Sequence, residues 1–345
     1  LRLATVHRRK MAVIEFAPLN VPLERRLQTL AVLFYVFFFL IAPPLSIFIA
    51  IYLFFTSFWW ITVLYGIWFI YDFRCPEHGS RPFRFLQNGA HWKYFAKYFP
   101  MELVKTADLS PDHNYIFGSH PHGIMSLGAF TTFCTDGTGF WEAYSGLKPY
   151  LAALNGQFWF PFRREFILLS GVISCSKSSL SYVLNTDKGV ALAIVLGGAE
   201  EALDARHGCY DLLLLRRKGF IRLALETGAH LVPVYHFGEN DTFSQLTNER
   251  GSTLRKFQVI FRRYAGFSSP IFSGRGIFNY TFGILPFRTP IHTVVGKPIV
   301  VEKNPNATRE EVDRLHERYC NELKKLFDTY KEKYGIPKDT HLNFY

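Results

Sequence analysis

Two histidines share a short loop motif, His120-Pro121-His122-Gly123. The motif directly follows the apolar stretch Asn114–Gly118, and loops that leave the strands of an α/β sheet often carry functional groups. A neutral imidazole titrates near pH 6.5 and can accept a proton at neutral pH, so a histidine here could act as a general base. The pair could instead hold a metal ion or serve the fold alone. The pattern leaves these three interpretations open, although its spacing indicates no further metal ligands.

A second loop motif combines glycines with glutamates. Gly197-Gly198-Ala199-Glu200-Glu201 follows the continuous apolar run Ala191–Leu196. Glycines let the backbone approach other groups closely, and a carboxylate in such a loop can orient a histidine and stabilise its charged form. The alternative is a solvated glutamate at a helix N-terminus, where the helix dipole favours it.

Basic residues gather in two places after these loops. Arg217, Lys218 and Arg222 lie at the start of a helical pattern beside Gly219, an arrangement that suits phosphate groups. The stretch from Arg250 to Val301 has no acidic residue and mixes basic with aromatic side chains. Such a stretch can bind an anionic membrane surface, a phosphorylated ligand or nucleic acid, or can form an ordinary solvated face. Because no nucleic-acid motif accompanies it, we favour the membrane surface or a phosphate-bearing ligand.

The elements that must position these groups have the pattern of one α/β unit over residues 72–345. Strand patterns cover 114–118, 191–196, 231–235 and 293–301, the last as a strand pair or a strand with a bulge. Helical patterns cover 218–227, with Gly228 as its C-cap, and a C-terminal segment. That C-terminal helix begins at the capping box Thr308-x-x-Glu311 and ends before Gly335. Strands alternating with helices predict a largely parallel, covered sheet.

The 45 residues from Leu27 to Tyr71 contain no Asp, Glu, Lys or Arg. One membrane-spanning helix needs about 20 apolar residues, so the segment has room for two. Pro43-Pro44 predicts an interruption between limbs 27–42 and 45–71, either as a re-entrant hairpin or as two unequal transmembrane spans. A buried helical hairpin of a soluble core is the alternative. Both flanks, including the arm 1–26, are basic, which predicts that both face the cytosol.

Composition agrees with a folded protein that contacts lipid. The 345 residues carry 39 Lys and Arg against 28 Asp and Glu, for a formal net charge of +11, and 49% are hydrophobic. Such apolar content excludes a disordered chain. The 35 Phe residues are unusually many. Five scattered cysteines without a CxxC pair predict reduced thiols and a cytosolic domain.

Several long motifs together resemble one family, the type-two diacylglycerol acyltransferases, and most of all its monoacylglycerol acyltransferase branch. These motifs are Tyr98-Phe99-Pro100, His120–Gly123 with Gly128-Ala129-Phe130, GGAEEALDAR (Gly197–Arg206), RKGFIRLALETGAHLVPVYHFGEND (Arg217–Asp241) and TVVGKPI (Thr293–Ile299). They occur in the family's order, and the resemblance covers nearly all of the chain after Met11.

The resemblance implies a membrane-bound enzyme that transfers an acyl group from acyl-CoA to monoacylglycerol. The product, diacylglycerol, would feed triacylglycerol synthesis at the endoplasmic reticulum membrane and lipid droplets. No cofactor or metal is implied beyond acyl-CoA as co-substrate, and no nucleic-acid partner; a homo-oligomer is left open. Diacylglycerol, a long-chain alcohol or retinol are alternative acceptors. A non-catalytic lipid-binding or droplet protein is the alternative of another class.

The resemblance also implies roles for single residues. Related glycerolipid acyltransferases carry a His-x4-Asp motif, but here Met125 and Leu127 stand at that spacing from the two histidines. We therefore expect Glu201 to be the acidic partner that holds the imidazole of His122, the general base. His120 would support the turn or assist the oxyanion, with the backbone at Gly123 as a further donor. The expected contacts of the CoA phosphates are Arg217, Lys218 and Arg222.

Overall fold

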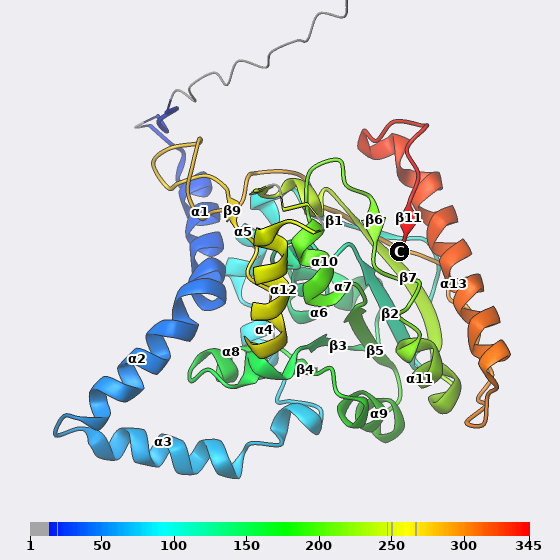
Figure 1. Ribbon diagram of the computed structural model, residues 1–345, viewed down its shortest axis with the longest axis horizontal. Helices are drawn as coiled ribbons and strands as arrows, with labels where there is room; N and C mark the ends of the chain where they lie inside the picture. The colour runs from blue at the N-terminus through cyan, green and yellow to red at the C-terminus, as the bar shows by residue number, and fades with distance from the viewer. Residues whose placement is uncertain (1–13, 19, 247, 250, 266–267) are drawn as a thin grey trace, which may run out of the picture.

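The computed structural model describes residues 14–345 except 19, 247, 250 and 266–267 (Figure 1). Its centre is a seven-stranded sheet in the order β1-β10-β7-β2-β5-β3-β4. The strands are β1 (Glu102–Lys105), β2 (Tyr115–His120), β3 (Lys148–Ala153), β4 (Val172–Ser174), β5 (Val190–Val195), β7 (His230–Phe237) and β10 (His292–Val295). All neighbours run parallel except β10 and β7. The predicted α/β fold with a largely parallel sheet is confirmed.

The sheet is covered on both faces, because its central strands alternate their side chains between two apolar cores. In β2, Tyr115 and Phe117 join one core, whereas Ile116 joins the other. The first core is closed by α1 (Leu23–Val36), α5 (Ala90–Tyr98), α6 (Leu127–Cys134) and α8 (Arg163–Leu169). The second is closed by α9 (Lys177–Thr186), α11 (Gly219–Thr227) and α13 (Arg309–Tyr330). In Figure 1, α1 and α13 lie at opposite sides of the sheet.

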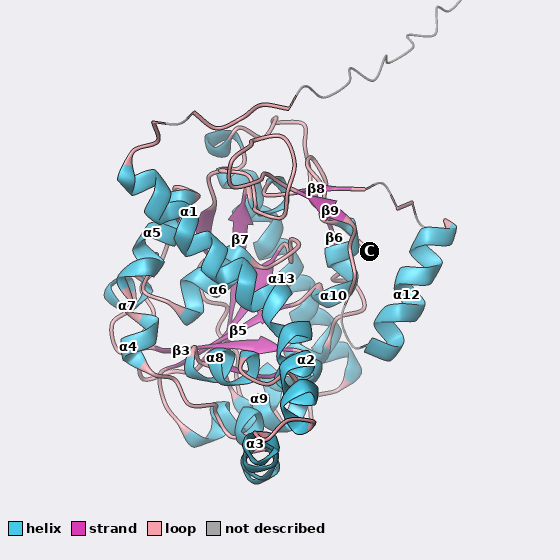
Figure 2. Cartoon of the chain, turned by 90° about the vertical axis from the view of Figure 1, so that its left-hand side faces the viewer, coloured by secondary structure: helices cyan, strands magenta, loops and turns pink. Residues whose placement is uncertain are grey.

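The remaining elements are short or peripheral. They are α2 (Ala42–Phe54), α3 (Trp59–Tyr71), α4 (Arg84–Gln87), α7 (Phe140–Ala143), α10 (Gly198–Glu201), α12 (Thr253–Ala265), and the two-residue strands β6 (Asp211–Leu212), β8 (Ser244–Gln245), β9 (Phe272–Ser273) and β11 (Asn343–Phe344). Helix α12, within the acid-free stretch, stands at the edge of the molecule (Figure 2).

Most predicted elements are present. The strand patterns correspond to β2, β5, β7 and β10, but β10 ends at Val295 and only a single bridge joins Ile299 to Leu231. Helix α11 ends at Gly228 in the left-handed conformation, as expected of a C-cap glycine. The capping box of α13 is formed by the Thr308 hydroxyl and the Glu311 carboxylate. All five cysteines are free, in agreement with the predicted reduced thiols.

The predicted interruption at Pro43-Pro44 is wrong, because one helix runs from Leu23 to Phe54. A π-helical turn, Phe37–Ile41, precedes the prolines, and the Ala42 N–H bonds to the Phe37 carbonyl. The prolines then occupy the first turn of α2, where a missing N–H costs little. Arg163 donates to the Phe39 carbonyl at 3.1 Å, inside the π turn. The chain turns instead between Phe54 and Trp59.

The uncharged segment divides into a buried part and an exposed part. On α1, Val32, Tyr35 and Val36 belong to the core of the α/β unit. Helix α3 has no buried residue, and α2 buries only its first turn. Both extend away from the sheet along the lower left of Figure 1. In the described part of the chain, the helix Leu23–Phe54 alone is long and apolar enough to cross a membrane.

Candidate active site

Three loops meet at the carboxyl ends of the central strands. Strand β2 lies between β5 and β7, and all three are parallel. Their carboxyl ends therefore share one edge of the sheet, where α/β proteins commonly bind ligands. This edge brings together the His120–Gly123 loop, the glycine–glutamate loop after β5, and a third segment, Gly238–Asp241, after β7.

The His122 imidazole is held in a form that can accept a proton. Its Nδ1 lies 3.0 Å from the Gly123 carbonyl oxygen. A carbonyl can only accept, so Nδ1 carries the hydrogen and Nε2 keeps its lone pair. Burial lowers the pKa of His122, and the hydrogen bond to the Gly123 carbonyl partly opposes this effect. At neutral pH, His122 is therefore uncharged and has a basic Nε2.

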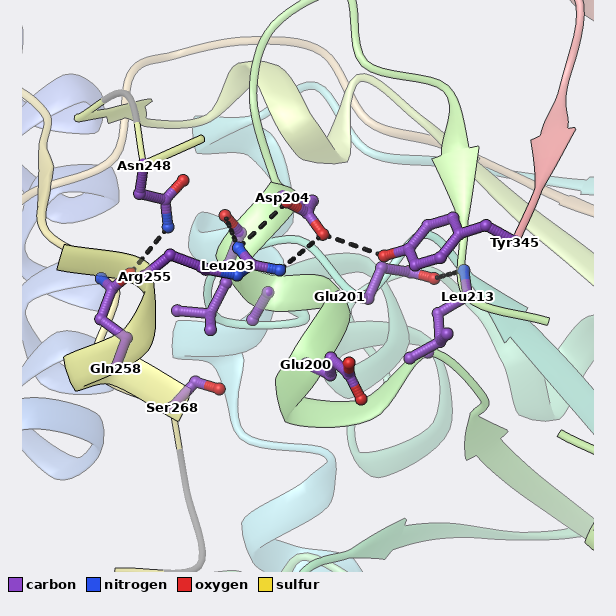
Figure 3. A network of polar contacts seen from close by, with 12 residues as sticks. Glu200, Glu201, Leu203, Asp204, Leu213, Asn248, Arg255, Gln258, Ser268 and Tyr345 are labelled. Carbon is purple, nitrogen blue, oxygen red and sulfur yellow. Dashed lines mark hydrogen bonds and ion pairs between the residues drawn. The ribbon is translucent and has the colours of Figure 1, made fainter. Parts of the chain in front are cut away.

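Glu201 contacts the loop through its backbone. One carboxylate oxygen accepts the N–H of His122 at 2.7 Å. The other accepts the N–H of Leu213 at 2.9 Å, as Figure 3 shows. The side chain is buried, which raises the pKa of Glu201 to about 7, against the effect of the two backbone donors. The contact differs from the expected one: Glu201 fixes the path of the loop rather than the tautomer of the imidazole.

The His120 side chain contacts a residue of the second core. It is fully buried, and its Nε2 lies 3.1 Å from the hydroxyl of Tyr319 on α13. That hydroxyl donates to the Gly118 carbonyl at 3.1 Å. Burial, together with the nearby His236, lowers the pKa of His120 to about 3. These contacts suit a neutral residue that supports the loop.

Glu239 is a second buried carboxylate at this site, and sequence reasoning did not single it out. Its two carboxylate oxygens accept the N–H groups of Leu127 and Gly128, at 2.7 and 2.8 Å, where α6 begins. Burial raises the pKa of Glu239 to about 7, and the two amides oppose this shift. Glu201 and Glu239 thus bind the His122 loop at both of its ends. Glu239 directly follows strand β7, as Glu201 follows β5, and this position was the sequence signal that could have identified it.

The loop needs its glycines because it wraps closely around these side chains. Gly123 has a φ of +61°, and a Cβ there would lie 2.6 Å from Cγ of Glu239. A Cβ at Gly128 would lie 2.7 Å from Nδ1 of His236. Larger residues at either position would push the glutamate or the histidine out of place.

A buried polar chain links three strands beneath the loop. His236 on β7 lies 2.6 Å from the hydroxyl of Ser119 on β2 and 2.9 Å from that of Thr293 on β10. Burial lowers the pKa of His236 to about 3. Sequence reasoning missed this chain, because its members come from three separate strands and share no spacing.

Helix α1 also reaches the loop. The Tyr35 hydroxyl donates to the Met125 carbonyl at 2.9 Å, and the Tyr35 ring packs against Phe95 and Phe130. The long apolar helix is therefore attached directly to the loop that carries His122.

The three cations expected to contact CoA phosphates differ in the acidic partners that they have in the described chain. Lys218 forms an ion pair with Asp313 at 2.7 Å. Arg217 lies 3.8 Å from Glu200, which also pairs with Arg216 and Arg262. Arg222 is exposed. The chain's own acids thus already partly neutralise two of the three.

A buried ion pair anchors the segment that carries Glu201 (Figure 3). Asp204 accepts two hydrogen bonds from Arg255 of α12, at 3.0 and 2.9 Å, and one from the hydroxyl of Tyr345. Arg255 also donates to the Leu203 carbonyl. The acid-free stretch is therefore tied to the glycine–glutamate motif. No group of three or more potential metal ligands lies among the described residues.

Comparisons with known proteins show the family of the chain. A family model described as diacylglycerol acyltransferase matches residues 51–345. The 2-acylglycerol O-acyltransferase 1 of Bos taurus is 47% identical over 96% of this chain and 99% of its own length. The diacylglycerol O-acyltransferase 2 of Homo sapiens is 43% identical over 91% of this chain and 82% of its own.

A solved acyltransferase aligns only weakly. The crystal structure of the 1-acyl-sn-glycerophosphate acyltransferase PlsC from Thermotoga maritima covers 89% of this chain and 98% of its own, at a TM-score of 0.39 and 12% identity. The family model and the curated relatives are decisive by themselves, and they confirm the resemblance: the chain belongs to the diacylglycerol acyltransferase family and is an acyltransferase.

Proposed function

We propose that this acyltransferase esterifies monoacylglycerol with an acyl group from acyl-CoA and releases diacylglycerol for triacylglycerol synthesis. The observation that carries the chemistry is the neutral His122, whose Nδ1 is engaged by a carbonyl while Nε2 remains basic. The choice of acceptor is supported by the relatives named 2-acylglycerol O-acyltransferase, which match this chain over nearly its full length.

The reaction needs no covalent enzyme intermediate. Nε2 of His122 takes the proton of the acceptor hydroxyl while that oxygen attacks the thioester carbonyl carbon. As the tetrahedral intermediate collapses, the C–S bond breaks and the CoA thiolate takes the proton from the imidazolium. The backbone N–H of Gly123 is the proposed donor to the oxyanion. General base catalysis of this kind contributes about 10²–10⁴-fold.

The two buried glutamates serve this reaction by fixing the loop in advance. Three of their four accepted N–H bonds hold His122 at one end and the start of α6 at the other, and the fourth, from Leu213, holds Glu201 itself. A base fixed before the substrate binds loses no further conformational freedom when the reaction occurs. His120 is proposed to support the same loop from the side of α13.

Arg217, Lys218 and Arg222 remain proposed contacts for the CoA phosphates. Binding would require Arg217 and Lys218 to exchange Glu200 and Asp313 for phosphate oxygens. Arg222 can make such a contact without losing an ion pair, because none is formed to it in the described chain.

We further propose that α2 and α3 enter the endoplasmic reticulum membrane from its cytosolic face as a re-entrant hairpin. Each has 13 residues, a length of about 20 Å against an apolar bilayer thickness of about 30 Å. Neither alone reaches across, and both carry exposed apolar side chains. The catalytic domain then faces the cytosol, where acyl-CoA is available, and the same hairpin suits the surface of a lipid droplet.

A panel of acceptors tests the proposal. Membranes that contain the full chain receive one labelled acyl-CoA with monoacylglycerol, diacylglycerol, a long-chain alcohol or retinol, and the products are separated. We expect monoacylglycerol to react fastest; a faster reaction with another acceptor would overturn the assignment. His122→Ala should lose about 10²-fold or more of the rate at equal expression. A near-normal rate in that variant would exclude His122 as the base.

A further inference from the structure

A large groove lies on the molecule between α1 and the segment 275–288. Its volume is about 1380 Å³. One wall comes from residues 16–18 and 20–33, and the other from the segment after β9. The walls are tied together where the Ala17 N–H donates to the Phe278 carbonyl at 2.9 Å. The apolar part of the lining includes Leu27, Leu30, Leu33, Ile277, Phe278 and Phe287.

Arginines form much of the polar part of this lining. Arg25, Arg26, Arg275 and Arg288 all contribute to it. Arg275 is only 8% exposed. Burial and the neighbouring Arg25 and Arg275 lower the pKa of Arg288 to about 10, although Tyr98 opposes this shift. The charges of Arg25 and Arg275 therefore both act on Arg288.

None of Arg25, Arg275 and Arg288 forms an ion pair with a carboxylate in the part of the chain that the structure describes. Arg288 donates to Gln28, Thr29 and the Arg25 carbonyl, all neutral groups. Arg275 donates to the Gly276 carbonyl. The acid nearest in sequence, Glu24, is paired with Lys97 at 3.0 Å. Arg275 is buried and Arg288 is half-buried. Cations in such positions without a counter-charge are costly to the fold, and an anion bound beside them would reduce that cost.

The rim of the groove is apolar and open. Phe16, Leu30 and Phe278 are 71, 62 and 77% exposed. Exposed apolar patches of this kind mark sites that bind membranes, ligands or other proteins. The N-terminal half of the helix Leu23–Phe54 lines this groove. The other half of the same helix carries the exposed apolar residues of α2. Both features connect the groove with the bilayer rather than with the aqueous phase.

We propose that this groove binds an anionic phospholipid of the bilayer, with its phosphate among Arg25, Arg275 and Arg288 and an acyl chain along Leu27, Leu30 and Leu33. Guanidinium groups suit phosphate because they can donate two parallel hydrogen bonds to it. Acyl-CoA has the same combination of phosphate and acyl chain. The CoA nucleotide, however, would have to lie against the apolar walls, which favours the phospholipid.

Photocrosslinking of the full chain tests the site. The protein is reconstituted in phosphatidylcholine nanodiscs that contain a small fraction of a photoactivatable phosphatidic acid, and the labelled peptides are sequenced. We expect the label on segments 16–33 and 275–288. Arg275→Gln and Arg288→Gln should each reduce it by about tenfold, because each removes one charge from the phosphate site. Arg318→Gln, on the exposed face of α13, is the matched control and should leave it unchanged.

Two further arms separate the possible outcomes. Arg25→Gln alters an exposed residue, so it keeps the test valid if the buried variants fail to fold. An excess of unlabelled phosphatidic acid should abolish the label, whereas phosphatidylcholine should not. If acyl-CoA displaces the label as well as phosphatidic acid does, the groove is an acyl-CoA site and the phospholipid proposal is wrong. Labelling elsewhere, or labelling insensitive to the arginine changes, would also overturn it.

Discussion

We propose that the buried carboxylate of Glu239 acts on catalysis without touching a substrate. Both of its oxygens accept backbone N–H groups at the start of α6, and Gly123 and Gly128 leave space for it. Because a carboxylate has only acceptors, it can satisfy both amides together. Its contribution is to the position of the loop rather than to proton transfer.

Replacing Glu239 by Gln should therefore impair activity although the shape of the side chain is kept. A glutamine offers one oxygen and one NH₂ group, so one of the amides would face another donor. Losing such a buried bond costs about 1–3 kcal/mol, or about five- to a hundredfold if the loss falls on kcat. Steady-state kinetics of Glu239→Gln and of the exposed control Glu302→Gln measure this effect. Equal kcat in both variants would contradict the assigned role.

The same two glutamates predict a pH dependence of stability. Burial raises the pKa of Glu201 and of Glu239 from 4.5 to about 7, so the folded protein holds these protons more tightly than the unfolded chain. Their stabilising contribution is complete below pH 4.5 and is lost as the pH rises through about 7. For one such group the change is roughly 3 kcal/mol.

Thermal unfolding measures this contribution by difference. The Tm advantage of the wild type over Glu201→Gln should shrink as the pH rises from about 4.5 to 7. Comparing the two proteins at each pH removes the titration of all other groups. A difference that grows over this range would mean that the glutamate is stabilised as the anion.

Among single residues, the sequence pattern predicted those that directly follow a strand. His122 and Glu201 follow β2 and β5, and the motif pattern identified both. The partner of each carboxylate was not predictable, because the contacts are to backbone amides. Glu239 binds an amide 112 positions away in the sequence, and no local spacing encodes that pairing.

Among the elements, α1 has two roles that its apolar sequence does not distinguish. One face packs into the core of the α/β unit, while its first turns line the groove between α1 and the segment 275–288. Its Tyr35 reaches the Met125 carbonyl in the loop after His122. The long apolar helix is thus part of the support of the candidate active site.

Removing the hydroxyl of Tyr35 tests this connection. In Tyr35→Phe the ring still packs against Phe130, but the Met125 carbonyl loses its donor. We expect a loss of about 1 kcal/mol in stability and a several-fold fall in kcat with little change in the KM for acyl-CoA. Tyr182→Phe, on an exposed side chain of α9, is the matched control. A kcat unaffected by Tyr35→Phe would mean that this contact does not position the loop.

The π turn explains why sequence misplaced the break in the uncharged segment. Two consecutive prolines normally end a helix, since they lack an N–H and crowd the preceding turn. Here the widened turn Phe37–Ile41 comes first, and Arg163 bonds one of its carbonyls. Because Arg163 lies far away in the sequence, its hydrogen bond to the π turn could not be predicted from the local sequence.

For the whole molecule, the strand patterns were sufficient to predict a covered, largely parallel sheet, but not the order of its strands. The antiparallel pairing of β10 with β7 places Thr293 beside His236, and the short edge strands β1 and β4 carry little apolar signal of their own. Strand order depends on which helices pack on each face, and those contacts connect distant parts of the chain.

The exposed apolar surface of α2 and α3 leads to a prediction about membrane attachment. Ile67, in the middle of α3, is 61% exposed, because no other part of the described chain buries it. If the hairpin lies in the bilayer, Ile67→Glu places a charge there, at a cost of about 2.5–3.5 kcal/mol. The fold should tolerate the change, because α3 contributes nothing to either core. We therefore expect a larger fraction of the protein to be released from membranes by alkaline carbonate, with an unchanged Tm for the detergent-purified protein.

Val300→Glu is the matched control, since Val300 is 60% exposed but lies on the α/β unit. Equal release of the two variants would mean that α3 lies outside the bilayer, and the membrane would then have to be contacted by the helix Leu23–Phe54 alone.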